Sequence, residues 1–145
     1  SATAYFDRCE LYSAGRNTEK KGYVTAASTP RGQKYGYVFR NCRFTGNSSR
    51  ESVYLGRPWR DYARTVLIDC YLGPHICREG WHDWGKREAH DTLYFAEYNS
   101  TGPGAVMDSR PEWVDILTGA RAMDYGREKV LGGEDGWMAA DRDTE

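Results

Sequence analysis

Arg57 and Trp59 lie two residues apart in the segment Tyr-Leu-Gly-Arg-Pro-Trp, residues 54–59. Arginine presents a planar guanidinium that pairs with a carboxylate through two parallel hydrogen bonds, and tryptophan offers a flat apolar surface for a sugar ring. Side chains two apart in an extended segment point to the same side, and Pro58 stiffens the backbone between them. We therefore expect Arg57 and Trp59 to share one face and to bind an acidic sugar or a carboxylate of the protein itself. The alternative is a surface turn with a buried tryptophan.

The other candidate motifs each lack a required residue. Residues 80–86 have the spacing of a phosphate-binding loop, but Arg87 stands where a Ser or Thr must reach Mg²⁺. Cys77, His82 and His90 lack the paired short spacings of a zinc site. There is no Gly-x-Ser-x-Gly segment to supply a serine nucleophile. The sequence predicts no nucleotide, no metal, no other cofactor and no serine esterase.

An internal repeat indicates the elements that must position Arg57. Cys9, Cys42, Cys70 and Tyr98 lie 33, 28 and 28 residues apart. In each block a large apolar residue is followed two later by a polar one, which is Arg8, Asn41, Asp69 or Glu97. Such alternation marks a strand with one buried face, and the slip of one residue after the polar position marks a bend. Strand, bend and strand at this period predict an all-β fold, a right-handed parallel β-helix (solenoid) in which the cysteines stack about 4.8 Å apart.

The cysteines Cys9, Cys42 and Cys70 are expected to be small core residues without chemistry, because unpaired cysteine is among the most buried residue types. A disulfide between neighbouring coils is the alternative. We expect one domain over 1–145, with coils at about 1–109 and a partly helical capping tail at about 110–145. This tail, with a Gly-rich turn at 131–137, is expected to pack along the solenoid and cover its terminal coil.

Composition narrows the class of partner. The 20 Lys and Arg against 21 Asp and Glu give a net charge of -1 with no basic run, which argues against nucleic acid. No stretch approaches the roughly 20 apolar residues of a membrane span, and residues 1–15 lack the layout of a signal peptide. We therefore predict neither a nucleic-acid partner nor a membrane partner.

Residues 54–59 resemble a signature of the pectin methylesterases, or pectinesterases, and the likeness extends along essentially the whole chain. Residues 22–29, 94–105 and 131–137 are similar to segments of that family in the same order. The resemblance implies a right-handed parallel β-helix, in agreement with the repeat. It also implies pectin, as methyl-esterified homogalacturonan, for the substrate, and a secreted or periplasmic location because that polymer is too large to enter cells.

The resemblance implies a chemistry with no metal or organic cofactor. One aspartate attacks the methyl ester carbonyl, a second acts as acid and then base, and two glutamines stabilise the oxyanion. Arg57 matches the catalytic arginine that holds the nucleophilic carboxylate, and Trp59 matches the tryptophan that contacts the sugar. An arginine partner keeps such a carboxylate ionised and oriented.

The 145 residues depart from the family at the nucleophile. The family's Asp-Phe-Ile-Phe-Gly segment is not among them, and would come directly before residues 1–6. Asp91 resembles the aspartate of another family motif, but it precedes Tyr94 and so falls in the wrong coil. We expect the C-terminal half of a pectin methylesterase, inactive alone, that self-associates or pairs with its missing N-terminal half. The alternatives are a non-catalytic pectin-binding module and a structural β-helix without a ligand.

Overall fold

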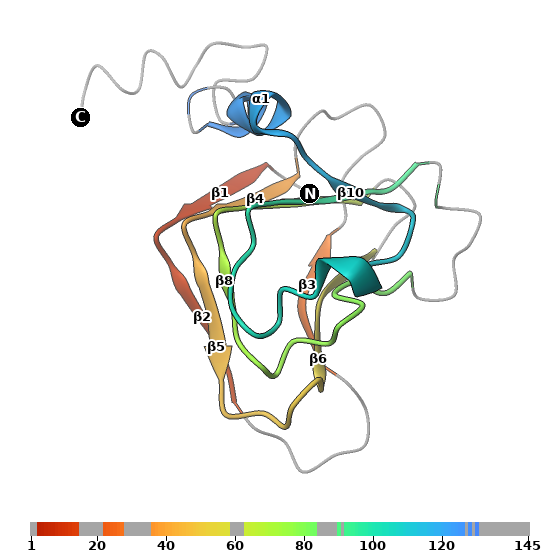
Figure 1. Ribbon diagram of the computed structural model, residues 1–145. Helices are drawn as coiled ribbons and strands as arrows, with labels where there is room; N and C mark the ends of the chain where they lie inside the picture. Colours follow the sequence, from red (N-terminus) through yellow and green to blue (C-terminus); the bar gives the residue numbers. More distant parts are fainter. Residues whose placement is uncertain are drawn as a thin grey trace.

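The computed structural model describes residues 3–14, 22–27, 36–58, 63–83, 90, 92–126, 128 and 130. All its paired strands run parallel, in three sheets that form the walls of a coil (Figure 1). The five-stranded sheet has the order β1 (Ala4–Asp7), β4 (Tyr37–Arg40), β7 (Arg64–Ile68), β9 (Tyr94–Tyr98) and β10 (Val114–Ile116). The three-stranded sheet contains β2 (Glu10–Ser13), β5 (Arg43–Gly46) and β8 (Tyr71–Leu72), and the two-stranded sheet contains β3 (Gly22–Ala27) and β6 (Val53–Pro58). The predicted parallel β-helix is confirmed.

The bend between the five-stranded and three-stranded sheets explains the polar position of the repeat. Arg8, Asn41, Asp69 and Asn99 occupy this corner in successive coils, with φ of 56°, 53°, 54° and 56°. Left-handed backbone is costly for most residues, and Asn and Asp tolerate it best because their short side chains bond locally. The corner therefore favours Asn or Asp, which occupy it in three of the four coils, whereas the first coil has Arg8 there.

The fourth coil corrects the predicted alignment. Tyr98 pairs with Ile68, and Thr101 bridges to Tyr71, so Ser100 rather than Tyr98 lies level with Cys70. The prediction was wrong by two residues because it took Glu97 for the corner residue. Glu97 instead pairs with Leu67 and is fully buried in the solenoid interior.

The four cysteines are free, so the predicted disulfide alternative is wrong. Cys42 and Cys70 are buried, and their thiols donate to the main-chain oxygens of Phe6 and Phe39 in the preceding coil, at 3.4 and 3.5 Å. Burial raises the pKa of Cys70 to about 12. These two cysteines act as small core residues, as expected, whereas Cys9 is exposed.

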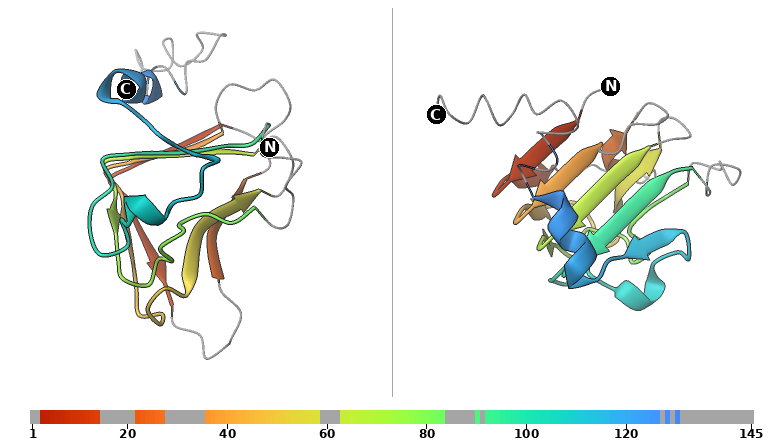
Figure 2. Two further views of the ribbon diagram at one scale, coloured as in Figure 1. Left: turned by 45° about the vertical axis from the view of Figure 1, so that its right-hand side comes forward. Right: turned by 90° about the horizontal axis from the view of Figure 1, so that it is seen from above.

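The three middle strands of the five-stranded sheet, β4, β7 and β9, have buried residues on both faces. The inner face of the sheet contributes Phe39, Leu67 and Phe95 to the interior of the coil. Its outer face packs against the segment that contains α1 (Gly119–Ala122) and η3 (Met123–Tyr125), which lies across it (Figures 1 and 2). The contacts join two sets of apolar residues: Val38, Val66, Ile68 and Ala96 of the sheet, and Leu117, Ala122, Tyr125 and Val130 of the tail.

The described part of the tail packs along the solenoid, as expected, but differs from its prediction in two ways. The solenoid continues past residue 109, since β10 pairs with β9, and after η2 (Met107–Ser109) the next short helices begin only at residue 119. They cover the outer face of the sheet rather than the terminal coil, because apolar side chains project from both faces of these parallel strands. The Gly-rich turn at 131–137 lies outside the described residues. No helix of the described part combines the length and apolarity needed to cross a membrane.

Candidate functional site

Arg57 lies in β6, which pairs in register with β3 so that Ala26 faces Arg57 and Tyr23 faces Tyr54. Its guanidinium carbon stands 5.1 Å from the centre of the Tyr23 ring, one coil away. A cation in this position is attracted by the negative face of the ring. Trp59 lies outside the described residues, so the shared face of Arg57 and Trp59 stays a prediction.

Three half-buried rings form a cluster on this part of the solenoid. The rings of Tyr23 and Tyr54 are stacked, 5.5 Å apart and 18° from parallel. The ring of His82 packs at an angle against both, 5.1 Å from Tyr54 and 6.1 Å from Tyr23. This ring cluster was missed in the sequence analysis. The signal available in the sequence was a tyrosine at the second position of each of the segments 22–27 and 53–58, but the pairing of these segments is seen only in the structure.

Residues 76–82 extend the wall formed by β3 and β6 into a third coil. Isolated parallel bridges join Val53 to Ile76 and Gly56 to Trp81. The amide of His82 donates to the carbonyl of Gly56 at 3.1 Å. Main-chain pairing, and not side-chain chemistry alone, therefore fixes His82 beside the strand that carries Arg57.

A buried ion pair holds residues 76–82 from inside the solenoid. The Nε of Arg110 donates to Oε2 of Glu97 at 2.6 Å, and its Nη2 donates to Oε1 at 3.1 Å. The indole of Trp81 donates to Oε2 of the same carboxylate at 2.9 Å. Gly80, at φ 77°, is required here because a Cβ would stand 2.6 Å from Nε of Arg110. Glu97 thus occupies a position that is apolar in the preceding coils, and its carboxylate accepts the hydrogen bond that anchors Trp81.

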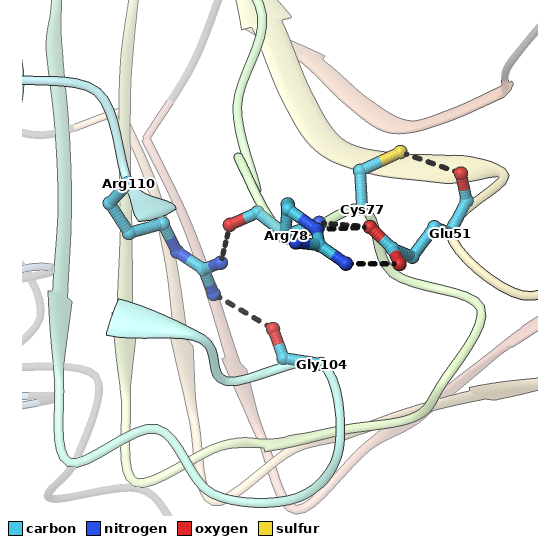
Figure 3. A network of polar contacts seen from close by, with 5 residues as sticks. All are labelled: Glu51, Cys77, Arg78, Gly104 and Arg110. Atoms are coloured by element: carbon cyan, nitrogen blue, oxygen red, sulfur yellow. Dashed lines mark hydrogen bonds and ion pairs between the residues drawn. The ribbon is translucent and has the colours of Figure 1, made fainter. Parts of the chain in front are cut away.

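The same arginine links this segment to neighbouring loops (Figure 3). Arg110 donates through Nη1 to the carbonyl of Arg78 at 2.7 Å and through Nη2 to that of Gly104 at 3.1 Å. Arg78 in turn forms a two-point ion pair with Glu51, at 2.8 and 3.0 Å. The hydrogen bonds from Arg78 lower the pKa of Glu51 to about 2. The thiol of Cys77 donates to the carbonyl of Glu51 at 3.2 Å.

The residues that the sequence excluded as zinc ligands have other contacts. Besides Cys77 and His82, already described, His90 lies 2.9 Å from a carboxylate oxygen of Asp83 through Nε2, and its ring stacks on Trp113 at 5.2 Å. Within the described ranges, no three His, Cys, Asp or Glu side chains gather in a way that could hold a metal ion. Asp91 lies outside the described residues.

Comparison with known proteins gives a consistent result. The model of the Pectinesterase family matches residues 1–134. Pectinesterase 2 of Arabidopsis thaliana is 35% identical over 151 aligned positions, which cover 97% of this chain and 25% of that protein. Pectinesterase 1 of Solanum lycopersicum is 34% identical, with coverage of 92% and 26%.

Solved structures agree. The pectin methylesterase from carrot has a TM-score of 0.79 and 27% identity, covering 94% of this chain and 46% of that one. A pectin methylesterase in complex with a hexasaccharide has a TM-score of 0.70 and 30% identity, covering 89% and 45%. The chain spans between 25% and 38% of the length of the first curated relatives it matches. Because the Pectinesterase family model matches residues 1–134, nearly the whole sequence, this chain belongs to the pectinesterase family.

Proposed function

We propose that the protein to which these 145 residues belong hydrolyses the methyl esters of polygalacturonate in cell-wall pectin. The observation that carries the proposal is the family match over residues 1–134 together with the placement of Arg57, the family's signature arginine, against the Tyr23 ring. In the described part, this sheet consists of β3 and β6. The guanidinium of Arg57 therefore reaches from β6 to the ring of Tyr23 on the neighbouring strand β3.

The role proposed for Arg57 is to hold and orient the carboxylate that attacks the ester. A guanidinium beside a carboxylate favours its charged form and fixes its direction through two hydrogen bonds. The carboxylate then attacks the ester carbonyl, and a second aspartic acid outside these residues protonates the leaving methoxide so that methanol departs and an acyl-enzyme anhydride remains. The same aspartate then takes a proton from the water that hydrolyses the anhydride, which releases the galacturonate and restores the nucleophilic carboxylate. Trp59 is proposed to contact the sugar. No step of this scheme needs a metal or an organic cofactor.

The 145-residue chain by itself is proposed to be inactive, because its sequence contains no Asp-Phe-Ile-Phe-Gly segment. A second candidate is a non-catalytic module that binds pectin or polygalacturonate through Arg57 and Trp59, and the same observation favours it. The upstream sequence of the gene distinguishes the two. An open reading frame that continues upstream into Asp-Phe-Ile-Phe-Gly supports the enzyme, and a natural start codon without it supports the module.

The assay measures methanol release from esterified pectin and binding of de-esterified polygalacturonate, for the chain and for any longer gene product. We expect methanol only from the longer product. In that product Arg57→Ala should reduce turnover far more than Trp59→Ala, because loss of the guanidinium disorders the nucleophile. Arg57→Lys should restore little, since an ammonium lacks the two-point geometry. Near-normal turnover with Lys would refute the orienting role, and methanol release by the 145-residue chain would refute catalysis by aspartates outside it.

We also propose a secreted or periplasmic location, because a cell-wall polymer is accessible there. Fractionation of the source cells, with detection of the protein in the medium or periplasm, tests this location. Recovery from the cytosol alone would contradict both the location and the proposed substrate.

A further inference from the structure

We propose that Tyr23 is a positioning residue for Arg57: its ring fixes the direction of the guanidinium that binds the carboxylate. The effect of Tyr23 on carboxylate binding rests on the proposed function, whereas the contact between Tyr23 and Arg57 lies within this chain. Tyr23 lies on β3 and Arg57 on β6, so the two residues belong to successive coils.

The geometry favours a fixed guanidinium. An arginine side chain has several rotatable bonds and loses binding free energy when it must be ordered on contact. In this structure the guanidinium carbon already lies 5.1 Å from the Tyr23 ring centre. The planar cation and the ring face attract each other electrostatically, which restricts the side chain before any carboxylate arrives.

The ring of Tyr23 is itself held in place. It stacks on Tyr54 at 5.5 Å with an 18° tilt, and His82 packs against both tyrosines. The register that sets Tyr23 opposite Tyr54 is maintained by main-chain pairing along β3 and β6. The amide of His82 is bonded to Gly56, the residue before Arg57. Tyr54 and His82 therefore support the ring that orients the arginine.

The first test is spectroscopic and needs no substrate. A proton above an aromatic ring resonates upfield, so the Nε–H signal of Arg57 in the 145-residue chain should be displaced upfield. The signal is assigned by its disappearance in Arg57→Lys. Tyr23→Leu should remove the displacement, and Tyr23→Phe, which keeps the ring face, should preserve it. Tyr12→Leu is the matched control for the same substitution, because Tyr12 is 60% exposed on β2, outside the ring cluster.

The second test measures binding of hexagalacturonate to the same variants. Tyr23→Leu should weaken binding roughly 2- to 30-fold, the range that corresponds to one cation–π contact, and Tyr23→Phe and Tyr12→Leu should leave it unchanged. Amide spectra confirm that each variant folds. An undisplaced Nε–H signal in the wild type would overturn the inference. So would unchanged binding in Tyr23→Leu where Arg57→Ala weakens binding, or a Tyr23→Phe variant that behaves like Leu. If Arg57→Ala binds as well as wild type, the second candidate function, binding of polygalacturonate through Arg57, fails, while the Nε–H signal still decides whether Tyr23 fixes the direction of the guanidinium.

Discussion

Replacing Arg110 by methionine should destabilise the chain severely, because it leaves Glu97 as an uncompensated buried charge. The side chains of the two residues are 2% and 0% exposed. Methionine keeps much of the volume but removes four hydrogen bonds, two to Glu97 and one each to the carbonyls of Arg78 and Gly104. Breaking a buried pair on one side costs about 3–5 kcal/mol.

The expected shift in melting temperature follows from the size of the chain. Unfolding entropy is about 2.1 cal/mol/K per residue, or about 0.3 kcal/mol/K for 145 residues. A loss of about 3–5 kcal/mol therefore lowers Tm by about 10–16 °C. Because whole domains are stable by only about 5–15 kcal/mol, the variant should be close to the limit of folding.

The double variant Glu97→Leu with Arg110→Met separates lost charge pairing from lost volume. Leucine at position 97 continues the interior ladder formed by Phe6, Phe39 and Leu67. The double variant leaves the Trp81 indole and the Ser100 hydroxyl without the acceptor that Glu97 supplies. A buried donor without a partner costs about 1–3 kcal/mol, yet the double variant should be more stable than Arg110→Met alone, because it no longer buries an unpaired charge. Urea unfolding followed by tryptophan fluorescence, with calorimetry, gives the free energies. A single-variant cost below about 1 kcal/mol, or a double variant no better than the single, would refute the reasoning.

Three further predictions follow from burial and exposure. His75 is 1% exposed, and burial lowers its pKa from 6.5. Because the unfolded chain then binds a proton more readily than the folded chain, the free energy of unfolding should fall as the pH drops below 6.5, by up to about 1.4 kcal/mol per pH unit. His75→Leu should flatten this pH dependence in urea titrations, and an unchanged slope would contradict the assignment to His75. Cys9 is exposed and the other three cysteines are buried, so one thiol per chain should react rapidly with a thiol reagent under native conditions, and more than one would contradict the burial. Phe6 is 37% exposed and Tyr12 is 60% exposed, on strands that end their sheets. Exposed apolar strand edges favour association, so light scattering should detect oligomers of the chain, and Phe6→Lys should reduce their proportion. A monomeric wild type would refute this prediction.

The coil period was readable from the sequence because each coil repeats the same local requirements. A strand with one buried face needs alternation, and a left-handed corner selects Asn or Asp. The same rules misled at the fourth coil, where Glu97 was taken for a corner residue. Its burial depends on Arg110, which lies 13 positions later, and a local pattern cannot reveal a partner at that distance.

The candidate site shows the same division. Arg57 could be named from its segment, because its chemistry and its neighbours are local. Its contact with Tyr23, 34 positions earlier by number, arises only when β3 and β6 pair. His82 joins the ring cluster only because its main-chain amide is hydrogen-bonded to the carbonyl of Gly56.

The sequence by itself determined the parallel β-helix, the burial of Cys42 and Cys70 and the resemblance to the pectinesterase family, since these depend on periodicity and on local residue chemistry. The tertiary structure alone decided the register of the fourth coil, the packing of the tail on the outer sheet face and the ring beneath the arginine. Those features depend on which residues of successive coils lie beside one another, and this alignment is fixed by the summed packing of side chains that are distant in sequence.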